Sequence, residues 1–147
     1  MRIEIDTGSR LDQSGDTTFA FSNHIQRVLL LHQSVRDECL NQLPGGRLKR
    51  ELRLFAACVY LLIKDHVREL DEITIDREYP GHEVEIRWLL LNLLKHPVRA
   101  VLPPLPVTFK RIGKKSKAHE LAFRTYREER APDQVLTAHD ILSALLA

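Results

Sequence analysis

Near its start the chain reads Arg2-Ile3-Glu4-Ile5-Asp6-Thr7-Gly8-Ser9, in which polar and β-branched residues alternate before a polar, glycine-containing turn. Alternation with a period of two residues is the pattern of a β-strand with one buried face. A second stretch of this kind reads Ile73-Thr74-Ile75-Asp76 and is stopped by the Pro80-Gly81 pair. Both stretches predict a strand with an aspartate at its carboxyl end.

The rest of the chain predicts three further strands and two long helices. Short runs between turn residues predict strands at 17–21, 25–32 and 107–112, although the run at 25–32 also fits a helix. Apolar residues at helical spacing predict helices from Leu48 to Val67 and from Glu83 to Leu94. Strands and helices therefore alternate after an initial run of three strands.

Helix-start signals predict the remaining helices. A short helix begins near Ser34, a second runs from Ser116 to about Arg130, and Thr137 with Asp140 resembles a capping box for a terminal helix. Four prolines predict a linker before the last strand: Pro97, Pro103, Pro104 and Pro106. This order predicts an α/β fold with a five-stranded mixed sheet, three antiparallel strands followed by two parallel ones, flanked by helices.

Length and composition indicate a single soluble domain over residues 1–147, since 44% of the residues are hydrophobic and 29% are charged. These values exclude a disordered tail, a collagen-like fibre and a disulfide-dense secreted scaffold. The apolar run at 55–63 is too short to span a membrane, and the first residues lack the apolar core of a signal peptide. We expect a cytoplasmic protein with no membrane partner.

Asp6 and Asp76 lie side by side if the strands that they end are neighbours in the sheet. Two carboxylates so placed repel each other, and a bound divalent cation relieves the repulsion. Ligand crevices in open α/β sheets lie at the carboxyl ends of strands, and Mg²⁺ sites use one or two carboxylates. The alternative is that each aspartate only begins a turn.

Three short motifs follow one another along the chain. They are Asp6-Thr7-Gly8-Ser9 after the first strand, Glu51-Leu52-Arg53-Leu54-Phe55-Ala56-Ala57 in the long helix, and Asp76-Arg77-Glu78-Tyr79 after the fourth strand. With these motifs in this order of elements, most of the chain resembles the ribonuclease H-like superfamily, the ribonuclease H and Holliday-junction resolvase type. The resemblance implies a ribonuclease H-like fold and a metal-dependent endonuclease that hydrolyses phosphodiester bonds by a two-metal mechanism.

The resemblance also implies which residues bind the metal. Asp6, Glu51 and Asp76 would converge and hold two Mg²⁺ or Mn²⁺ ions, with Asp6 as the bridging ligand. The alternative role of Glu51 is to complement the dipole of the helix in whose first turn it is expected.

The fourth ligand of the family is usually an aspartate, and two residues are candidates for it here. His119 occupies the corresponding place in the frame of residues 113–122, and its imidazole favours Mn²⁺ over Mg²⁺. Asp140 is the second candidate, and its alternative role is to cap the last helix. Both stay open.

Positive charge is concentrated near the last predicted strand. Between Val107 and Arg130 there are eight basic and three acidic residues, a net charge of +5, whereas the whole chain carries +2. Cations beside an acidic pocket are suited to binding the phosphate backbone, and the alternative is a solvated helix face. The candidates for binding nucleic acid are Lys110, Arg111, Lys114, Lys115 and Lys117.

Two departures from the family concern the substrate. Lys49 and Arg50 stand where ribonucleases H place asparagines that read RNA 2′-hydroxyls, and Glu78 stands where a glutamine is common. RNA–DNA hybrid and branched DNA therefore both stay open as substrates, and monomer and homodimer both stay open as oligomeric states. The rival hypothesis is a non-catalytic nucleic-acid-binding or interaction domain on the same fold.

Overall fold

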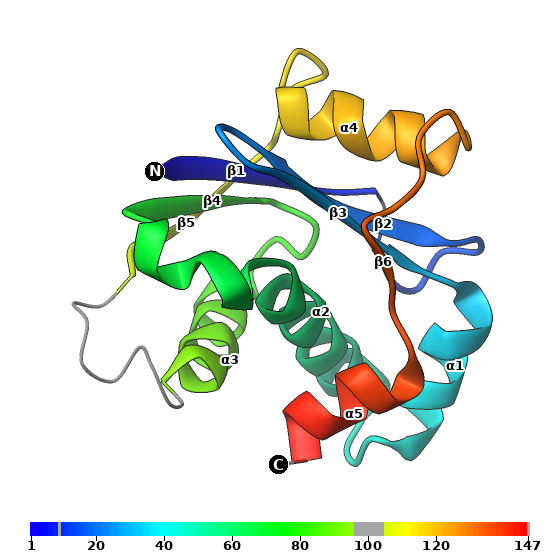
Figure 1. The fold of residues 1–147 in the computed structure, drawn as a ribbon. Helices are drawn as coiled ribbons and strands as arrows, with labels where there is room; N and C mark the ends of the chain where they lie inside the picture. Colours follow the sequence, from blue (N-terminus) through cyan, green and yellow to red (C-terminus); the bar gives the residue numbers. More distant parts are fainter. Residues whose placement is uncertain (9, 96–104, 147) are drawn as a thin grey trace.

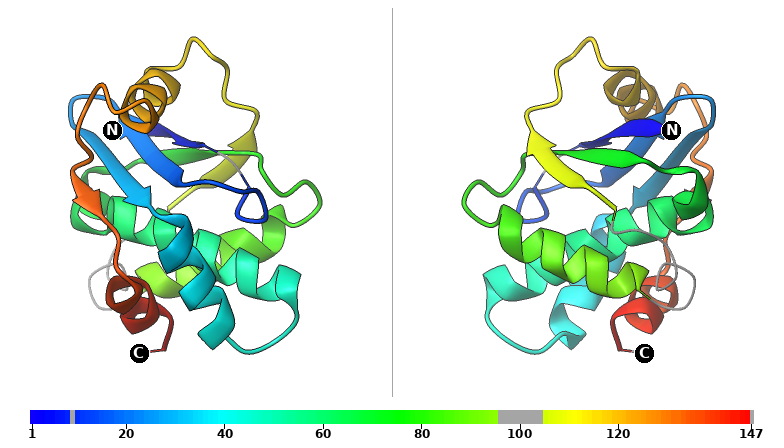
Figure 2. Two further views of the ribbon diagram at one scale, coloured as in Figure 1. Left: turned by 90° about the vertical axis from the view of Figure 1, so that its right-hand side faces the viewer. Right: turned by 90° about the vertical axis from the view of Figure 1, so that its left-hand side faces the viewer.

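The computed structural model describes residues 1–8, 10–95 and 105–146, which form a six-stranded mixed sheet with helices on both faces (Figures 1 and 2). Ser9 of the first motif and Pro97, Pro103 and Pro104 of the predicted linker lie outside these residues. The strands are β1 (Arg2–Thr7), β2 (Thr17–Ser22), β3 (Gln26–Leu31), β4 (Glu72–Asp76), β5 (Val107–Lys110) and β6 (Gln134–Val135). The helices are α1 (Gln33–Gln42), α2 (Arg47–Ile63), the 3₁₀ helix η1 (Lys64–Glu69), α3 (Glu83–Leu94), α4 (Lys117–Tyr126) and α5 (Ala138–Leu146).

The strands lie in the order β5-β4-β1-β2-β3-β6. The first three form antiparallel pairs, β4 runs parallel to β1, and β5 runs parallel to β4, as predicted. The predicted strand count of five is wrong, because β6 adds a sixth strand parallel to β3. This strand has only two residues and no alternation of its own. Backbone and side-chain hydrogen bonds between Asp133 and Val28, of 2.9 and 2.7 Å, fix it to β3.

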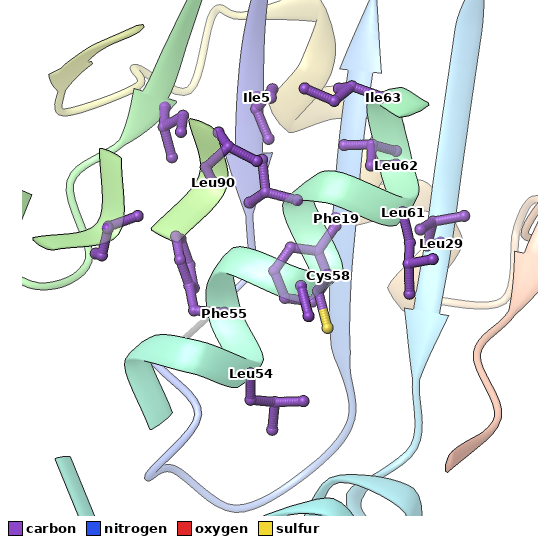
Figure 3. Packing of buried hydrophobic residues seen from close by; sticks show 14 of the residues in the cluster. Ile5, Phe19, Leu29, Leu54, Phe55, Cys58, Leu61, Leu62, Ile63 and Leu90 are labelled. Carbon is purple, nitrogen blue, oxygen red and sulfur yellow. The ribbon is translucent and has the colours of Figure 1, made fainter. Parts of the chain in front are cut away.

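The main core lies between one face of the sheet and helices α2 and α3 (Figure 3). Ile5 and Phe19 point from the sheet into this core, where the Phe19 ring meets Phe55 of α2 edge to face with centroids 5.9 Å apart. Leu90 of α3 also enters it. The apolar face predicted for the long helix is therefore the surface that anchors it to the sheet.

Among the described residues, helix α4 is the helix that covers the opposite face (Figures 1 and 2). Its contact is a small apolar cluster in which Leu121 and Ala122 meet Ala20 of β2 and Val28 of β3. Small side chains let the helix approach the strands closely. Because α4 is short and packs mainly on β2, the carboxyl ends of β1 and β4 border a cavity on this face.

Several element ends differ from the prediction. The helix expected over 48–67 is α-helical only to Ile63 and continues as η1, and the strand expected over 107–112 ends at Lys110. Ser116 caps α4 as predicted, since its hydroxyl accepts the N–H of Ala118 at 3.2 Å, but the helix ends at Tyr126. Within the described ranges, we find no helix with both the length and the apolar character needed to cross a membrane.

Candidate functional site

Asp6 and Asp76 end two neighbouring parallel strands. Ile5 pairs in register with Ile75, so the next residue on each strand is an aspartate. Since Ile5 and Ile75 face the main core, the period-two alternation turns both aspartates to the α4 face. The expectation that the first and fourth strands bring these two carboxylates together is met by the sheet order.

His119 of α4 lies directly over Asp6. Its Nδ1 is 3.4 Å from Oδ1 of Asp6, whose side chain is almost completely buried. The helix begins at Lys117, so His119 is in its first turn, where α4 passes over the carboxyl end of β1. Three of the candidates from the sequence, two aspartates and one histidine, therefore meet on one face of the sheet.

These side chains line a cavity of about 710 Å³. Its walls are the carboxyl ends of β1 and β4, the segments that follow β1, β4 and β5, and one face of α4. Gly8 lines the cavity next to β2, and a Cβ at this position would come within 3.1 Å of the Thr18 hydroxyl. This close approach explains the glycine of the first motif.

Glu78 also lines the cavity, although the sequence did not single it out as a site residue. It follows Asp76 by two residues in a tight turn, and its carboxylate accepts a hydrogen bond from the Thr7 hydroxyl at 3.3 Å. The spacing Asp-Arg-Glu at the end of a strand could have identified Glu78, because a tight turn brings the side chains of residues i and i+2 close together. Glu78 therefore joins Asp6 and Asp76 as a third carboxylate near the carboxyl ends of β1 and β4.

Two of these carboxyl groups have strongly raised pKa values. Burial raises the pKa of Asp6 to about 6, with a further contribution from the Asp76 charge, while the neighbouring His119 opposes the increase. Burial also raises the pKa of Glu78 to about 7, aided by its hydrogen bond with Asp76 and by the Asp76 charge. In the absence of a cation, protonation of Glu78 relieves the repulsion. Acids perturbed in this way are typical of functional sites.

Glu51 does not join this group. It lies on α2, on the other side of the sheet, and does not line the cavity. Its buried carboxylate accepts hydrogen bonds from Arg47 at 3.1 Å and from the Tyr79 hydroxyl at 3.4 Å. The Tyr79 hydroxyl in turn accepts the N–H of Leu11 at 3.1 Å, so Glu51 connects α2 to the loop after β1.

Asp140 caps α5. Its carboxylate accepts the N–H of Thr137 at 2.9 Å, and the Thr137 hydroxyl accepts the N–H of Asp140 at 3.1 Å, which is the predicted capping box. The hydrogen bond from the Thr137 backbone lowers the pKa of Asp140. Of the two candidates for a fourth ligand, the structure places His119 in the cavity and Asp140 outside its lining.

The basic candidates divide into three kinds. Arg111 and Lys114 line the cavity, and Lys110 instead pairs with Glu4 at 3.2 Å. Lys115 and Lys117 are exposed and do not line the cavity. Within the described part of the chain, Lys110 is therefore the one candidate that forms an ion pair, and the other four form none.

The types of donor atom in the cavity, carboxylate oxygens and an imidazole nitrogen, are those that bind divalent cations. Carboxylate oxygens suit Mg²⁺ and Mn²⁺, and an imidazole nitrogen favours Mn²⁺. Across residues 1–8, 10–95 and 105–146, however, no three histidine, cysteine, aspartate or glutamate side chains are already grouped closely enough to hold a metal.

Comparison of the chain with protein-family models, curated proteins and solved structures finds no match. Function is therefore inferred from the cavity and its side chains.

Proposed function

We propose that the protein is a divalent-metal-dependent endonuclease of the ribonuclease H-like superfamily. The observation that carries the proposal is the cavity in which Asp6, Asp76 and Glu78 meet His119 at the carboxyl ends of two neighbouring parallel strands. The order of elements, three antiparallel strands and then alternating helices and parallel strands, supports the same proposal. A six-stranded mixed sheet flanked by helices is compatible with that fold.

In this proposal the metal ligands are Asp6, Asp76, Glu78 and His119, so Glu78 replaces Glu51 in the set that the resemblance implies. Burial, with a smaller contribution from neighbouring negative charge, raises the pKa values of Asp6 and Glu78, and a bound cation would neutralise that charge. Two bound cations would supply a water of lowered pKa and stabilise charge on the phosphodiester oxygens.

The remaining residues orient these ligands and hold the substrate. The N–H of Ile112 donates to Asp76 at 3.0 Å and the Thr7 hydroxyl donates to Glu78, so both carboxylates are held in place. Arg111 and Lys114, which line the cavity, would bind the phosphate backbone and offset charge that develops on it.

The test is cleavage of labelled RNA–DNA hybrid, duplex and branched DNA in Mg²⁺ and in Mn²⁺. Asp76→Asn should reduce cleavage at least about a hundredfold, because it removes a ligand and a charge from a two-metal site. The amide keeps an oxygen acceptor for the N–H of Ile112, so the fold should persist. Asp140→Asn is the matched control, since it alters an aspartate that caps a helix, and it should cut like the wild type. A wild-type protein inert on all substrates, or an Asp76→Asn variant as active as the wild type, would refute the proposal.

One observation favours the rival, a non-catalytic nucleic-acid-binding or interaction domain. The described residues include no pre-formed group of three metal donors, as a decayed site would also show. Titration with Mn²⁺ separates the two hypotheses. The enzyme should bind Mn²⁺ saturably, with a rise in melting temperature that Asp76→Asn abolishes, whereas the binding domain should bind nucleic acid but show neither effect.

A further inference from the structure

The wall of the cavity formed by α4 is aromatic. Phe123 and Tyr126 line it, although their side chains are 49% and 57% exposed. Together with His119 they recur at intervals of four and three residues, which places them on one face of the helix. This aromatic wall begins above Asp6 and runs roughly 10 Å along α4, since the helix rises about 1.5 Å per residue.

The rings of the wall differ in what already covers them. The Phe123 ring is stacked on His119, with centroids 6.2 Å apart and planes inclined by 15°, and the Arg127 guanidinium lies 5.4 Å from its centroid. Tyr126 has no ring or cation partner of this kind within the described residues. Its hydroxyl lies beside Gly15 in the loop after β1, where a Cβ would be 3.7 Å away. Tyr126 therefore presents an exposed ring at the cavity.

The chemistry around the wall identifies the ligand that it fits. The Arg111 and Lys114 side chains, which form no ion pair within the described residues, line the same cavity and suit an anion. A volume of about 710 Å³ is within the range of small-molecule sites and accommodates a nucleotide. A ligand with a flat ring for Tyr126 and a phosphate for the two cations is a nucleotide unit of a nucleic acid.

We propose that Tyr126, supported by Phe123, stacks an unpaired nucleobase beside the phosphate that enters the acidic cavity. In an uninterrupted duplex the faces of each base are covered by its neighbours, and only an unpaired or splayed nucleotide exposes a face to a side chain. The substrate class is therefore single-stranded or branched nucleic acid rather than continuous hybrid duplex. The position beside a phosphate that is cut rests on the proposed function, whereas the stacking itself does not.

Trp88 makes a direct measurement feasible, because it is the only tryptophan of the chain and lies on α3, outside the cavity lining. Tyr126→Trp in a Trp88→Phe background places a single fluorophore in the aromatic wall. The probes are DNA and RNA 12-mers, single-stranded and as duplexes, in EDTA so that no cleavage occurs. Single strands should quench the fluorescence, whereas duplexes should do so only weakly.

Affinity measured by fluorescence anisotropy of the labelled 12-mers gives the second readout. Tyr126→Ala should weaken single-strand binding about tenfold, which is typical for the loss of one stacked base, and Tyr126→Phe should preserve it. Trp88→Ala is the matched control, since it removes a 64% exposed aromatic side chain from another helix, and should bind like the wild type. Melting temperatures near that of the wild type verify that the variants are folded.

The outcomes separate this inference from the proposed nuclease activity. The stacking is overturned if single strands do not quench the Tyr126→Trp fluorescence and Tyr126→Ala binds them like the wild type. It is also overturned if duplexes and single strands bind equally well and Tyr126→Ala weakens both to the same extent. A wild type that stacks single strands but cuts nothing in Mn²⁺ refutes the nuclease and leaves the stacking intact. Cleavage of branched DNA that is undiminished in Tyr126→Ala leaves the nuclease intact and overturns the stacking.

Discussion

Consecutive residues of one strand point to the two faces of the sheet and have different surroundings there. Ile5 and Asp6 are neighbours in β1 and both are buried, yet Ile5 enters the core beneath α2 while Asp6 faces His119 of α4. The α2 face is closed by a large apolar core, whereas α4 is held by a cluster of four apolar residues, and a cavity lies at the strand ends. If the proposed function is right, stability and chemistry are assigned to opposite sides of one strand.

Glu51 and Asp6 show the same difference between two buried acids. Glu51, on the α2 side, accepts hydrogen bonds from Arg47 and Tyr79. Asp6, on the α4 side, faces the Asp76 charge, and burial together with that charge raises its pKa to about 6. Burial alone thus does not identify a functional acid, and the groups that surround the acid distinguish a structural carboxylate from one prepared for a ligand.

The largest effect that we expect is the loss of stability when the α2 face is broken. Phe55→Ala should lower the free energy of unfolding by about 3–5 kcal/mol, because it leaves a cavity and removes the ring contacts with Phe19 and Tyr79. Phe123→Ala on the exposed α4 face is the control and should cost about 0.5 kcal/mol or less. Urea denaturation measures both. Equal losses would contradict the division of the sheet into a structural and a chemical face.

The sequence predicted the α2 face and the strand order better than it predicted the site. Alternation in β1 and β4 and helical spacing in α2 report directly on burial, and together with short runs between turn residues they predicted the first five strands and the long helix. Asp6 and Asp76, predicted from their places at strand ends, and His119, predicted from the family resemblance, all line the cavity. The sequence does not show which side of the sheet the carboxylate of a helical glutamate reaches.

Glu51 and Glu78 illustrate this limit. Glu51 was selected because its motif resembles that of a family, but in the structure it is bonded to Arg47 and Tyr79 on the α2 side. Glu78 reaches the cavity through a turn whose geometry depends on neighbouring strands. Strand β6 was missed for a similar reason, since two residues without a pattern pair with β3 through contacts of Asp133.

The stability of the metal-free protein should depend on pH through the α4 face. The folded pKa of Asp6 is about 6 against an ordinary value of 3.8, so the folded protein binds this proton more tightly than the unfolded chain. The stabilisation is complete below about pH 4 and is lost as the pH rises through about 6. Burial gives Glu78 the same sign, with a pKa of about 7.

Asp6→Asn removes this titration and sharpens the measurement. Thermal unfolding in EDTA should show the variant more stable than the wild type at pH 8, by up to about 1.4 kcal/mol for each unit of pKa shift, with the difference shrinking toward pH 5. In saturating Mn²⁺ the stability of the wild type should instead increase with pH, because ligands must lose their protons to bind a metal. A difference between the two proteins that is independent of pH would contradict a raised pKa at Asp6.

A smaller effect is expected from Glu51→Gln, which tests the two buried acids against each other. The amide oxygen can still accept from the Tyr79 hydroxyl, while the pairing with Arg47 loses its charge. We expect a loss of about 1 kcal/mol in stability and cleavage within about twofold of the wild type. Denaturation and cleavage are measured on the same preparation. A hundredfold loss of cleavage without a loss of stability would return Glu51 to the metal site, as the family resemblance implies.

The smallest effect should separate two lysines on the chemical face. Lys114 lines the cavity, whereas Lys110 is paired with Glu4 at 3.2 Å, so only Lys114 is free to release counterions on contact with phosphate. Lys114→Gln should weaken nucleic-acid binding by a few-fold at about 0.1 M salt and lower the slope of log affinity against log salt by about one. Lys110→Gln is the matched control, with the same change of charge, and should leave the slope unchanged. Anisotropy titrations over a range of salt concentrations measure the slope, and equal losses in the two variants would show that phosphate contacts extend beyond the cavity along β5.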